Sequence, residues 1–202
     1  MRMNGNTALN PGDLAINNPT DHARHWPIGS PISTPDTARA ELEDGTPVRL
    51  RLLDAEDSAT IQAFFESLSP RSLHQRFHQR LQTLSPPLLR LLCGMDGQRH
   101  VAVGAFADAG LIGIGRFVCS AENARTAEVA FSVADSSQGR GLGKKLLRAL
   151  AMAASERGVD TFLFTVLADN RAATRLLTIP GSSSVIRGGQ LEGRVNVADV
   201  LR

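Results

Sequence analysis

One short segment, Gln138–Leu147 (QGRGLGKKLL), constrains the fold more than any other part of the chain. Its three glycines stand at alternate positions, between an apolar run over residues 126–134 that is typical of a strand and an amphipathic run over 141–158 that is typical of a helix. Glycines leave backbone amides uncovered, and a helix N-terminus attracts anions through its amides and its dipole. The segment therefore predicts a strand, a phosphate-binding loop over 138–144 and a long helix, with Arg140, Lys144 and Lys145 adding positive charge.

Two familiar phosphate-binding loops do not fit this spacing. A P-loop needs glycine, four residues, glycine, lysine and a hydroxyl residue, but the position five before Gly143 is Gln138, and Lys144 is followed by Lys145. A dinucleotide-binding loop would place its third glycine where Lys144 stands, and it follows the first strand of a parallel sheet. Two interpretations remain: a pyrophosphate-binding loop of another kind, or a tight turn without a ligand.

Composition limits the functions that a protein with such a loop can have. A chain of 202 residues is the length of one domain with an extension, and a net charge of +2 argues against a nucleic-acid binder, although the pI is near 8.9. Cys93 and Cys119 lie far apart in apolar runs, as free buried thiols do in a reducing cytoplasm. No stretch approaches the roughly 18 apolar residues of a membrane span. The first residues also lack the apolar core of a signal peptide, so we expect a cytoplasmic protein.

The chain divides into an extension and a domain. Residues 1–44 are rich in Asn, Pro, Thr, Asp and Gly without periodicity, so we expect a flexible extension in which Trp26 and Ile28 are the apolar residues able to dock. Residues 45–202 form the expected domain, a mixed α/β sheet. Its predicted elements are a strand over 48–53, helices within 57–68, 69–81 and 85–94, strands over 100–107, 111–119 and 126–134, a helix over 141–158, a strand over 160–167, a helix over 169–177, and a hairpin within 182–201 that turns at Gly188 and Gly189.

The glycine segment also resembles a known motif. Gln138-x-x-Gly141-x-Gly143, after a strand ending FSVAD and ahead of the helix KKLLRAL, resembles motif A of the GNAT superfamily of N-acetyltransferases. The resemblance covers roughly residues 46–202 and includes LADNRAATRLL, in which Asn170 matches a recurrent asparagine. SPRSLHQRF and AEVAFSVADSSQGRGLG are similar to the catalytic domain of bacterial protein lysine acetyltransferases. The resemblance implies an α/β fold with a mixed, mostly antiparallel sheet, splayed at its centre and flanked by helices.

The resemblance further implies acetyl-CoA as cosubstrate and no metal. The pantetheine arm would pair with strand backbone, and the pyrophosphate would meet the glycine loop. The cofactor-binding residues implied in this way are Phe131, Val133, Gln138, Gly139, Arg140, Gly141, Leu142, Gly143, Lys144 and Asn170. The expected partners are an acyl-CoA and an acceptor protein or small amine, with no nucleic acid or membrane, and a homodimer is compatible with this pattern.

Glu128 is the candidate catalytic residue because it is the one acid inside an apolar strand. A lysine amine is almost wholly protonated at pH 7, so acyl transfer to it needs a base. In the lysine acetyltransferase branch a glutamate at the matching position has this role. We expect the carboxylate of Glu128 to be half-buried. The alternative is an ordinary ion pair with Arg116 or Arg125.

The sequence departs from the family at the general acid. The position where many members have a tyrosine is Leu177, and the chain has no tyrosine, so water or the departing amine proton would protonate the thiolate. His74 and His78 share a helix face but have no third metal ligand nearby, which favours a solvated or substrate-lining face. Arg71, Arg76 and Arg80 form either a charged exterior or a surface for an acidic partner.

The leading functional prediction is an acetyl-CoA-dependent N-acetyltransferase acting on a protein lysine, with Glu128 as base. One alternative is an acetyltransferase of small amines, which would call for acidic residues lining the acceptor cleft. Another is a non-catalytic acyl-CoA sensor that keeps the glycine motif and transfers nothing.

Overall fold

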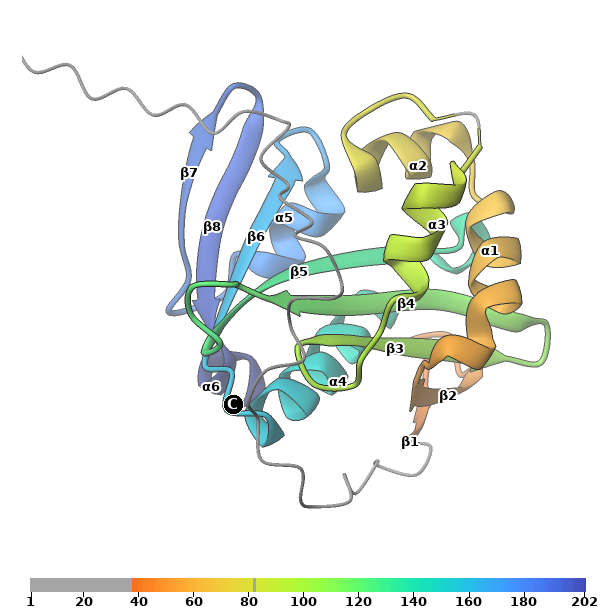
Figure 1. Ribbon diagram of the computed structural model, residues 1–202, viewed down its shortest axis with the longest axis horizontal. Helices are drawn as coiled ribbons and strands as arrows, with labels where there is room; N and C mark the ends of the chain where they lie inside the picture. The colour runs from red at the N-terminus through yellow and green to blue at the C-terminus, as the bar shows by residue number, and fades with distance from the viewer. Residues whose placement is uncertain (1–37, 82) are drawn as a thin grey trace, which may run out of the picture. The chain divides into compact units, whose positions relative to one another are not determined.

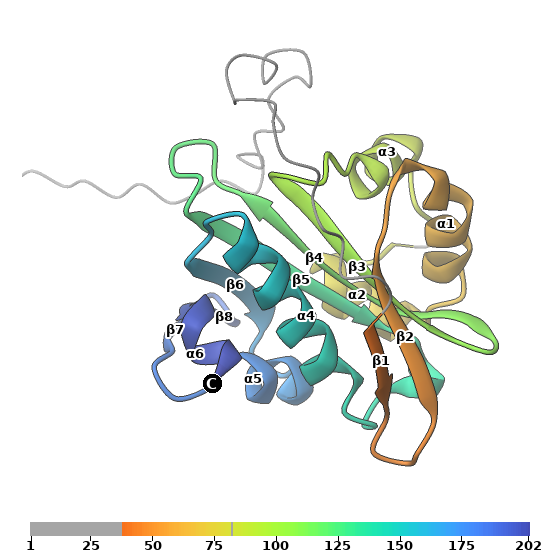
Figure 2. The same cartoon turned by 90° about the horizontal axis from the view of Figure 1, so that it is seen from below.

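A computed structural model describes residues 38–81 and 83–202. In these residues an eight-stranded sheet with the order β1-β2-β3-β4-β5-β6-β8-β7 has helices on both faces (Figures 1 and 2). All neighbouring strands are antiparallel except β5 and β6. The predicted α/β class with a mixed, mostly antiparallel sheet is therefore confirmed.

The elements follow the predicted order. The strands are β1 (Ala38–Glu41), β2 (Pro47–Leu52), β3 (His100–Ala107), β4 (Gly110–Cys119), β5 (Thr126–Val133), β6 (Thr161–Leu167), β7 (Ser183–Arg187) and β8 (Gln190–Asn196). The helices are α1 (Ser58–Glu66), α2 (Pro70–Phe77), α3 (Pro86–Cys93), α4 (Leu142–Glu156), α5 (Arg171–Leu177) and α6 (Val197–Leu201), with short 3-10 turns at Ala55–Asp57 and Asp135–Ser137. β1 and α6 are the elements that the sequence did not predict.

Local sequence explains where the helices on one face begin. Ser69 caps α2 by accepting the amide hydrogen of Ser72 at 3.2 Å, and Pro70 takes the first helical position, where a missing N–H costs nothing. The same serine and proline pattern starts α3 at Ser85. These two helices and α1 cover one face of the sheet, and α4 covers the other (Figure 2).

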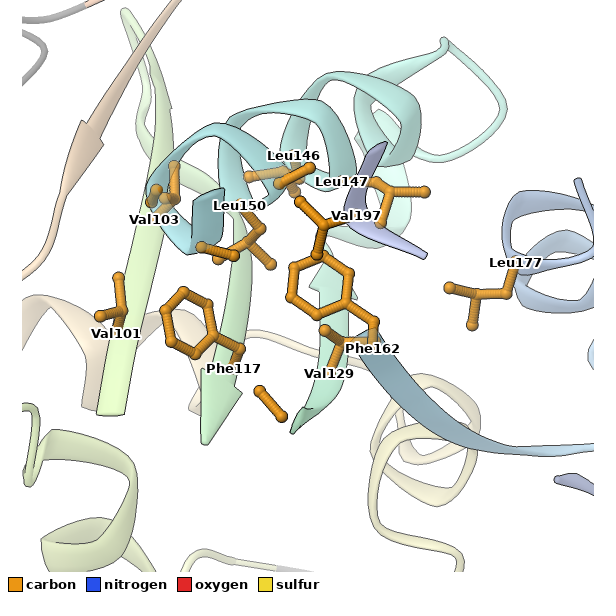
Figure 3. Packing of buried hydrophobic residues seen from close by; sticks show 14 of the residues in the cluster. Val101, Val103, Phe117, Val129, Leu146, Leu147, Leu150, Phe162, Leu177 and Val197 are labelled. Atoms are coloured by element: carbon orange, nitrogen blue, oxygen red, sulfur yellow. The ribbon is translucent and has the colours of Figure 1, made fainter. Parts of the chain in front are cut away.

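The core lies in two clusters, one on each face of the sheet. On the first face, Leu146 and Leu150 of α4 point toward Phe117 of β4 and Phe162 of β6, whose ring centroids are 6.1 Å apart (Figure 3). Fully burying each such side chain contributes roughly 1.5–3 kcal/mol. The second cluster joins α1, α2 and α3 to the opposite face. α4 is thereby fixed on the sheet, and the glycine loop at its N-terminus is fixed with it.

The sheet is splayed between β5 and β6, as predicted. Their parallel pairing covers only three residue pairs, from Thr126 with Thr161 to Glu128 with Leu163. β5 continues to Val133 with β4 as its partner on the other side. The two strands meet and then separate in Figure 1, so the second half of β5 has an open edge.

The expected extension over residues 1–44 is wrong for residues 38–44. Ala38–Glu41 pair with β2, and the turn that follows uses Gly45 in the left-handed region at φ 82°. Leu42 is buried in the core below this turn. Asp44-Gly45 is a strong short-range hairpin signal, which the polar composition of the segment obscured. The remaining expectation concerns residues 1–37, with Trp26 and Ile28, which lie outside the described residues.

Candidate active site

The glycine loop presents an uncapped helix N-terminus. Gly139 and Gly141 adopt φ values of 71° and 79°, a conformation that other residues rarely adopt. Gly141 is the N-cap of α4, and no side chain caps the helix. The first amides of a helix have no acceptor within the helix, so those of α4 are available to an anionic group.

The next residues of the motif have different roles. Gly143 has an ordinary backbone conformation, but a Cβ atom there would come within 3.3 Å of Leu176 in α5. Glycine at this position therefore lets α5 approach the start of α4. Leu142 is 1% exposed and belongs to the core, so only its backbone faces a ligand, whereas Lys144 is exposed.

The side chain of Arg140 is held by the β1–β2 hairpin. It forms an ion pair with Asp44 and donates a hydrogen bond to Oγ1 of Thr46. The backbone joins the same contact, because the amide of Glu43 donates to the carbonyl of Arg140 at 3.1 Å. The Arg140 guanidinium is thus engaged by an acidic turn that the sequence did not predict, and its contact with a phosphate stays a prediction.

The open edge of β5 exposes the backbone of alternate residues. The carbonyl of Thr126 accepts from Ser120, and the amide of Ala134 donates to Ile112, so the even-numbered residues direct their backbone groups toward the β4 side. Successive residues of a strand direct these groups to opposite sides. The backbone groups of Phe131 and Val133, both predicted to bind the cofactor, therefore face the splay.

The side chain of Gln138 is already hydrogen-bonded to one of these backbone groups. Its Nε2 donates to the carbonyl of Val133 at 3.1 Å and to Oγ of Ser72 in α2 at 3.0 Å. Its backbone amide donates to Asp135 at 3.4 Å. Gln138 thus connects the glycine loop, the open strand and α2.

Asp135 is a structural residue of the site that the sequence analysis missed. Its carboxylate accepts from the amide and the hydroxyl of Ser69, at 2.9 and 2.6 Å, and from the hydroxyl of Ser72 at 2.8 Å. Burial raises the pKa of Asp135, but these hydrogen bonds outweigh it and bring the pKa below its usual range. We call Ser69, Ser72, Asp135 and Gln138 the clasp, because they join α2 to the loop. The signal was an acid directly after a strand, with two serines at a predicted helix start.

Glu128 stands at the last paired position of β5, where the splay begins. Its side chain is exposed rather than half-buried. Neither expected ion-pair partner pairs with it, since Arg125 pairs with Asp160 at 2.6 Å and Arg116 donates to His100 and to Leu91. The ion-pair interpretation is therefore wrong for both arginines, and Glu128 forms no ion pair with any described residue.

Two guanidinium groups lie on the same face as Glu128. Arg116 is 6% exposed, and burial, with the charge of Arg76 adding to it, lowers its pKa to about 9. Arg76 of α2 is half-buried. Burial lowers its pKa to about 10, while the carboxylate of Glu128 opposes the shift. His100, buried beside Arg116, has its pKa lowered to about 4 by burial and then by that charge.

The remaining predicted residues have clear structural positions. Asn170 caps α5, its Oδ1 accepting the amide hydrogen of Ala173 at 3.1 Å. Leu177 is 2% exposed, so no proton donor replaces the missing tyrosine at that position. Nδ1 of His78, which ends α2 at a φ of 56°, lies 3.1 Å from Nε2 of Gln190.

Over residues 38–81 and 83–202, no three His, Cys, Asp or Glu side chains are grouped to hold a metal, and no helix is long and apolar enough to cross a membrane.

The arrangement suits an elongated ligand with two kinds of polar group. Amide groups would pair with the open backbone of Phe131 and Val133, as an added strand does. An anionic group would meet the uncapped start of α4. The opposite end of the ligand would then lie beside the carboxylate of Glu128, where a proton can be accepted.

Comparisons with known proteins agree with this geometry. A model described as the acetyltransferase (GNAT) family matches residues 61–178. Acetyltransferase PA5475 of Pseudomonas aeruginosa is 35% identical over 135 residues, which cover 65% of this chain and 72% of that protein. Acetyltransferase Pat of Mycolicibacterium smegmatis is 38% identical over 113 residues, 54% of this chain and 33% of Pat. The chain therefore matches about a third of the length of Pat.

The fold has a solved counterpart that is nearly matched along its whole length. The crystal structure of the GNAT domain of S. lividans PAT superposes with a TM-score of 0.73 at 27% identity. The match covers 79% of this chain and 96% of that one.

Proposed function

The chain belongs to the acetyltransferase (GNAT) family, and from this premise we propose that it transfers the acetyl group of acetyl-CoA to the amine of a protein lysine, with Glu128 as general base. The acetyltransferase class follows from the family. The acceptor and the base are the proposal, and the resemblance of SPRSLHQRF and AEVAFSVADSSQGRGLG to bacterial protein lysine acetyltransferases supports the acceptor.

The position of Glu128 carries this proposal. It is the last residue of β5 that is paired with β6, so it lies where the two strands begin to separate. The open backbone of Phe131 and Val133 continues from it toward the glycine loop. A thioester carried by a pantetheine arm along this edge would have its carbonyl near Glu128 and its pyrophosphate near α4.

The proposed reaction is a direct transfer. Glu128 accepts a proton from the acceptor ammonium, directly or through water, and the neutral nitrogen attacks the thioester carbon. The carbon–nitrogen bond forms and the carbon–sulfur bond breaks. A backbone N–H at the open edge of β5, such as that of Phe131, would stabilise the oxyanion. The thiolate takes its proton from water or from the proton that the amine released, since Leu177 offers none.

The test is Glu128→Gln with Glu122→Gln as matched control. Glu122 is an exposed acid in the loop ahead of β5. For Glu128→Gln we expect unchanged acetyl-CoA affinity and a fall in turnover of about 10²–10⁴-fold, which recovers partly as pH rises because more of the amine is then neutral. Turnover with protein and small-amine acceptors, with mass spectrometry of the products, and calorimetric binding of acetyl-CoA are the measurements.

Other outcomes separate the alternatives. Near-normal turnover in a folded Glu128→Gln protein at every pH would show that the base is another group or water. Products on small amines alone would identify a small-molecule acetyltransferase. Tight acetyl-CoA binding by the wild-type protein without any product would identify a non-catalytic sensor.

A further inference from the structure

The helical segment beside Glu128, residues 67–95, has positively charged side chains and no negatively charged ones. Residues 67–95 contain four arginines and two histidines but no aspartate or glutamate. α2 and α3 lie in this segment, and α2 contacts β5. An acceptor that approaches Glu128 along these helices meets no acid in this segment that would attract its amine.

Arg76 is the arginine of this segment that is half-buried, whereas Arg71, Arg80 and Arg90 are exposed. The guanidinium of Arg76 lies 4.9 Å from the centre of the Phe77 ring. Its side chain forms no ion pair and no hydrogen bond with any residue that the structure describes. Taking a cation out of water without a partner is costly, so the site is suited to an anion that compensates it.

The sheet below Arg76 and α2 itself have further unpaired polar atoms. Arg116 of β4 lies opposite Ala130 of β5, whose small side chain separates Glu128 from Ser132 on the same face. Oγ of Ser132 and Nδ1 of His74 are both buried without a hydrogen-bond partner. The face thus combines one free carboxylate with guanidinium, hydroxyl and imidazole groups that can bind an anion.

We propose that Arg76 binds a carboxylate of the acceptor, so that the preferred acceptors carry a carboxylate close to the reacting amine. This inference rests on the proposed function and names its substrate class. Glu128 and Arg76 act on each other electrostatically but are not ion-paired, so each is free for one group of such an acceptor. The carboxylate has two sources: an acidic residue beside a lysine in a protein, or the α-carboxylate of a free amino acid.

The experiment compares acceptors that differ only in the carboxylate. The first pair is a peptide with blocked ends and the sequence Glu-Lys-Glu against Gln-Lys-Gln, and the second is free lysine against lysinamide. The wild-type protein is compared with Arg76→Gln, with Arg76→Lys, and with Arg71→Gln, which removes an exposed arginine from the same helix. The readouts are kcat/KM for each acceptor and the dissociation constant of acetyl-CoA.

We expect the wild-type protein to prefer one carboxylate-bearing acceptor over its neutral partner by about ten- to a hundredfold, the range of a charge-assisted hydrogen bond. Arg76→Gln should reduce this ratio to about one, with most of the change in KM and none in acetyl-CoA affinity, and Arg76→Lys should keep part of it. Arg71→Gln should keep all of it. Preference within the peptide pair identifies a protein acceptor, and preference within the lysine pair identifies an amino acid.

Three results would overturn the inference. The first is a wild-type protein that acetylates the neutral acceptors as well as the carboxylate-bearing ones. The second is an unchanged preference in Arg76→Gln. The third is a loss of activity on all acceptors, together with a loss of acetyl-CoA binding, in both Arg76 variants, which is the result expected of a purely structural residue. A wild-type protein that binds acetyl-CoA but acetylates none of the four acceptors contradicts the proposed function itself, and the inference with it.

Discussion

Gly143 offers the cleanest test of the phosphate-binding loop at the scale of a residue. A substitution at Gly141 would combine backbone strain at φ 79° with a contact between its Cβ atom and Glu43 at 2.8 Å. Gly143 has an ordinary backbone conformation, and a Cβ atom added there would require only that the side chain of Leu176 shift by a few tenths of an ångström. An effect on ligand binding is therefore easier to separate there from an effect on folding.

For Gly143→Asp we expect a folded protein, because an acid in the first turn of α4 suits the helix dipole. The same carboxylate would repel a pyrophosphate, so the affinity for acetyl-CoA should fall by about tenfold or more, which is about 1.4 kcal/mol. Gly143→Ala measures the effect of packing alone and should bind nearly as well as the wild-type protein. Calorimetry that finds undiminished binding to folded Gly143→Asp would rule out the loop as the pyrophosphate site.

His100 makes stability depend on pH. Its Nδ1 donates to the carbonyl of Gly94 at 2.8 Å, which leaves Nε2 to accept from Arg116. Burial and then the Arg116 charge lower the pKa to about 4, against the opposing effects of Gly94 and Asp96. The unfolded value is about 6.5, so the unfolded chain binds more protons between these two pH values.

The contribution of His100 should therefore be complete above about pH 6.5 and decline as pH falls toward 4, by about 3 kcal/mol in all. Denaturant unfolding of the wild-type protein and of His100→Gln, measured from pH 7.5 to 4.5, checks this. Stability should fall more steeply with acid in the wild-type protein than in the variant. Parallel curves would show that His100 titrates as it does in the unfolded chain.

At the scale of elements, the clasp relates α2 to the glycine loop. The carboxylate of Asp135 holds the start of α2, and Arg76 lies near the other end of that helix. For Asp135→Asn we expect a loss of one or more charge-assisted hydrogen bonds, each worth roughly 1.5–3 kcal/mol in favourable surroundings and less at this exposed site. The acceptor KM should rise more than the dissociation constant of acetyl-CoA.

Asp108→Asn, in the exposed turn between β3 and β4, is the control for the clasp. Steady-state kinetics with one acceptor, together with calorimetry, give the two constants. Equal changes in both constants, or none, would mean that α2 is positioned without Asp135.

The elements that the sequence predicted are those with strong local signals. The serine and proline pattern at the starts of α2 and α3, the buried leucines of α4 and the glycines between β7 and β8 were each sufficient. The splay came from resemblance to a family, because strand divergence leaves no periodic pattern. Glu128 became a candidate both through its place in an apolar strand and through that resemblance. The exposure of Glu128 and the partner of Arg140 depend on segments far apart in sequence, so no local pattern contains them.

At the scale of the whole molecule, the segment ahead of β2 divides into two parts. Polar composition alone would make residues 1–44 dispensable for cofactor affinity, but Glu43 and Asp44 contact Arg140 of the glycine loop. We expect a protein that lacks residues 1–37 to bind acetyl-CoA as the full chain does. A protein that lacks residues 1–46 should bind more weakly, because it loses β1 and the contacts that hold Arg140.

Calorimetry on both truncated proteins, with circular dichroism as the control for folding, checks this division. The double substitution Glu43→Gln with Asp44→Asn removes the charges without removing β1, so a loss confined to the shorter truncated protein would assign the effect to β1. Weak binding after removal of residues 1–37 alone would give that segment a part in the site.

In the free protein, the side chain of Gln138 already donates a hydrogen bond to the carbonyl of Val133, which a bound ligand would also use. A ligand amide that reaches this carbonyl must first displace the glutamine side chain, so one hydrogen bond is exchanged for another and the net gain is small. Selectivity between carriers of the acetyl group would then come from the far end of the carrier. A short carrier without a pyrophosphate would have to displace Gln138 with nothing at α4 to compensate, and the protein would discriminate against it before any chemistry begins.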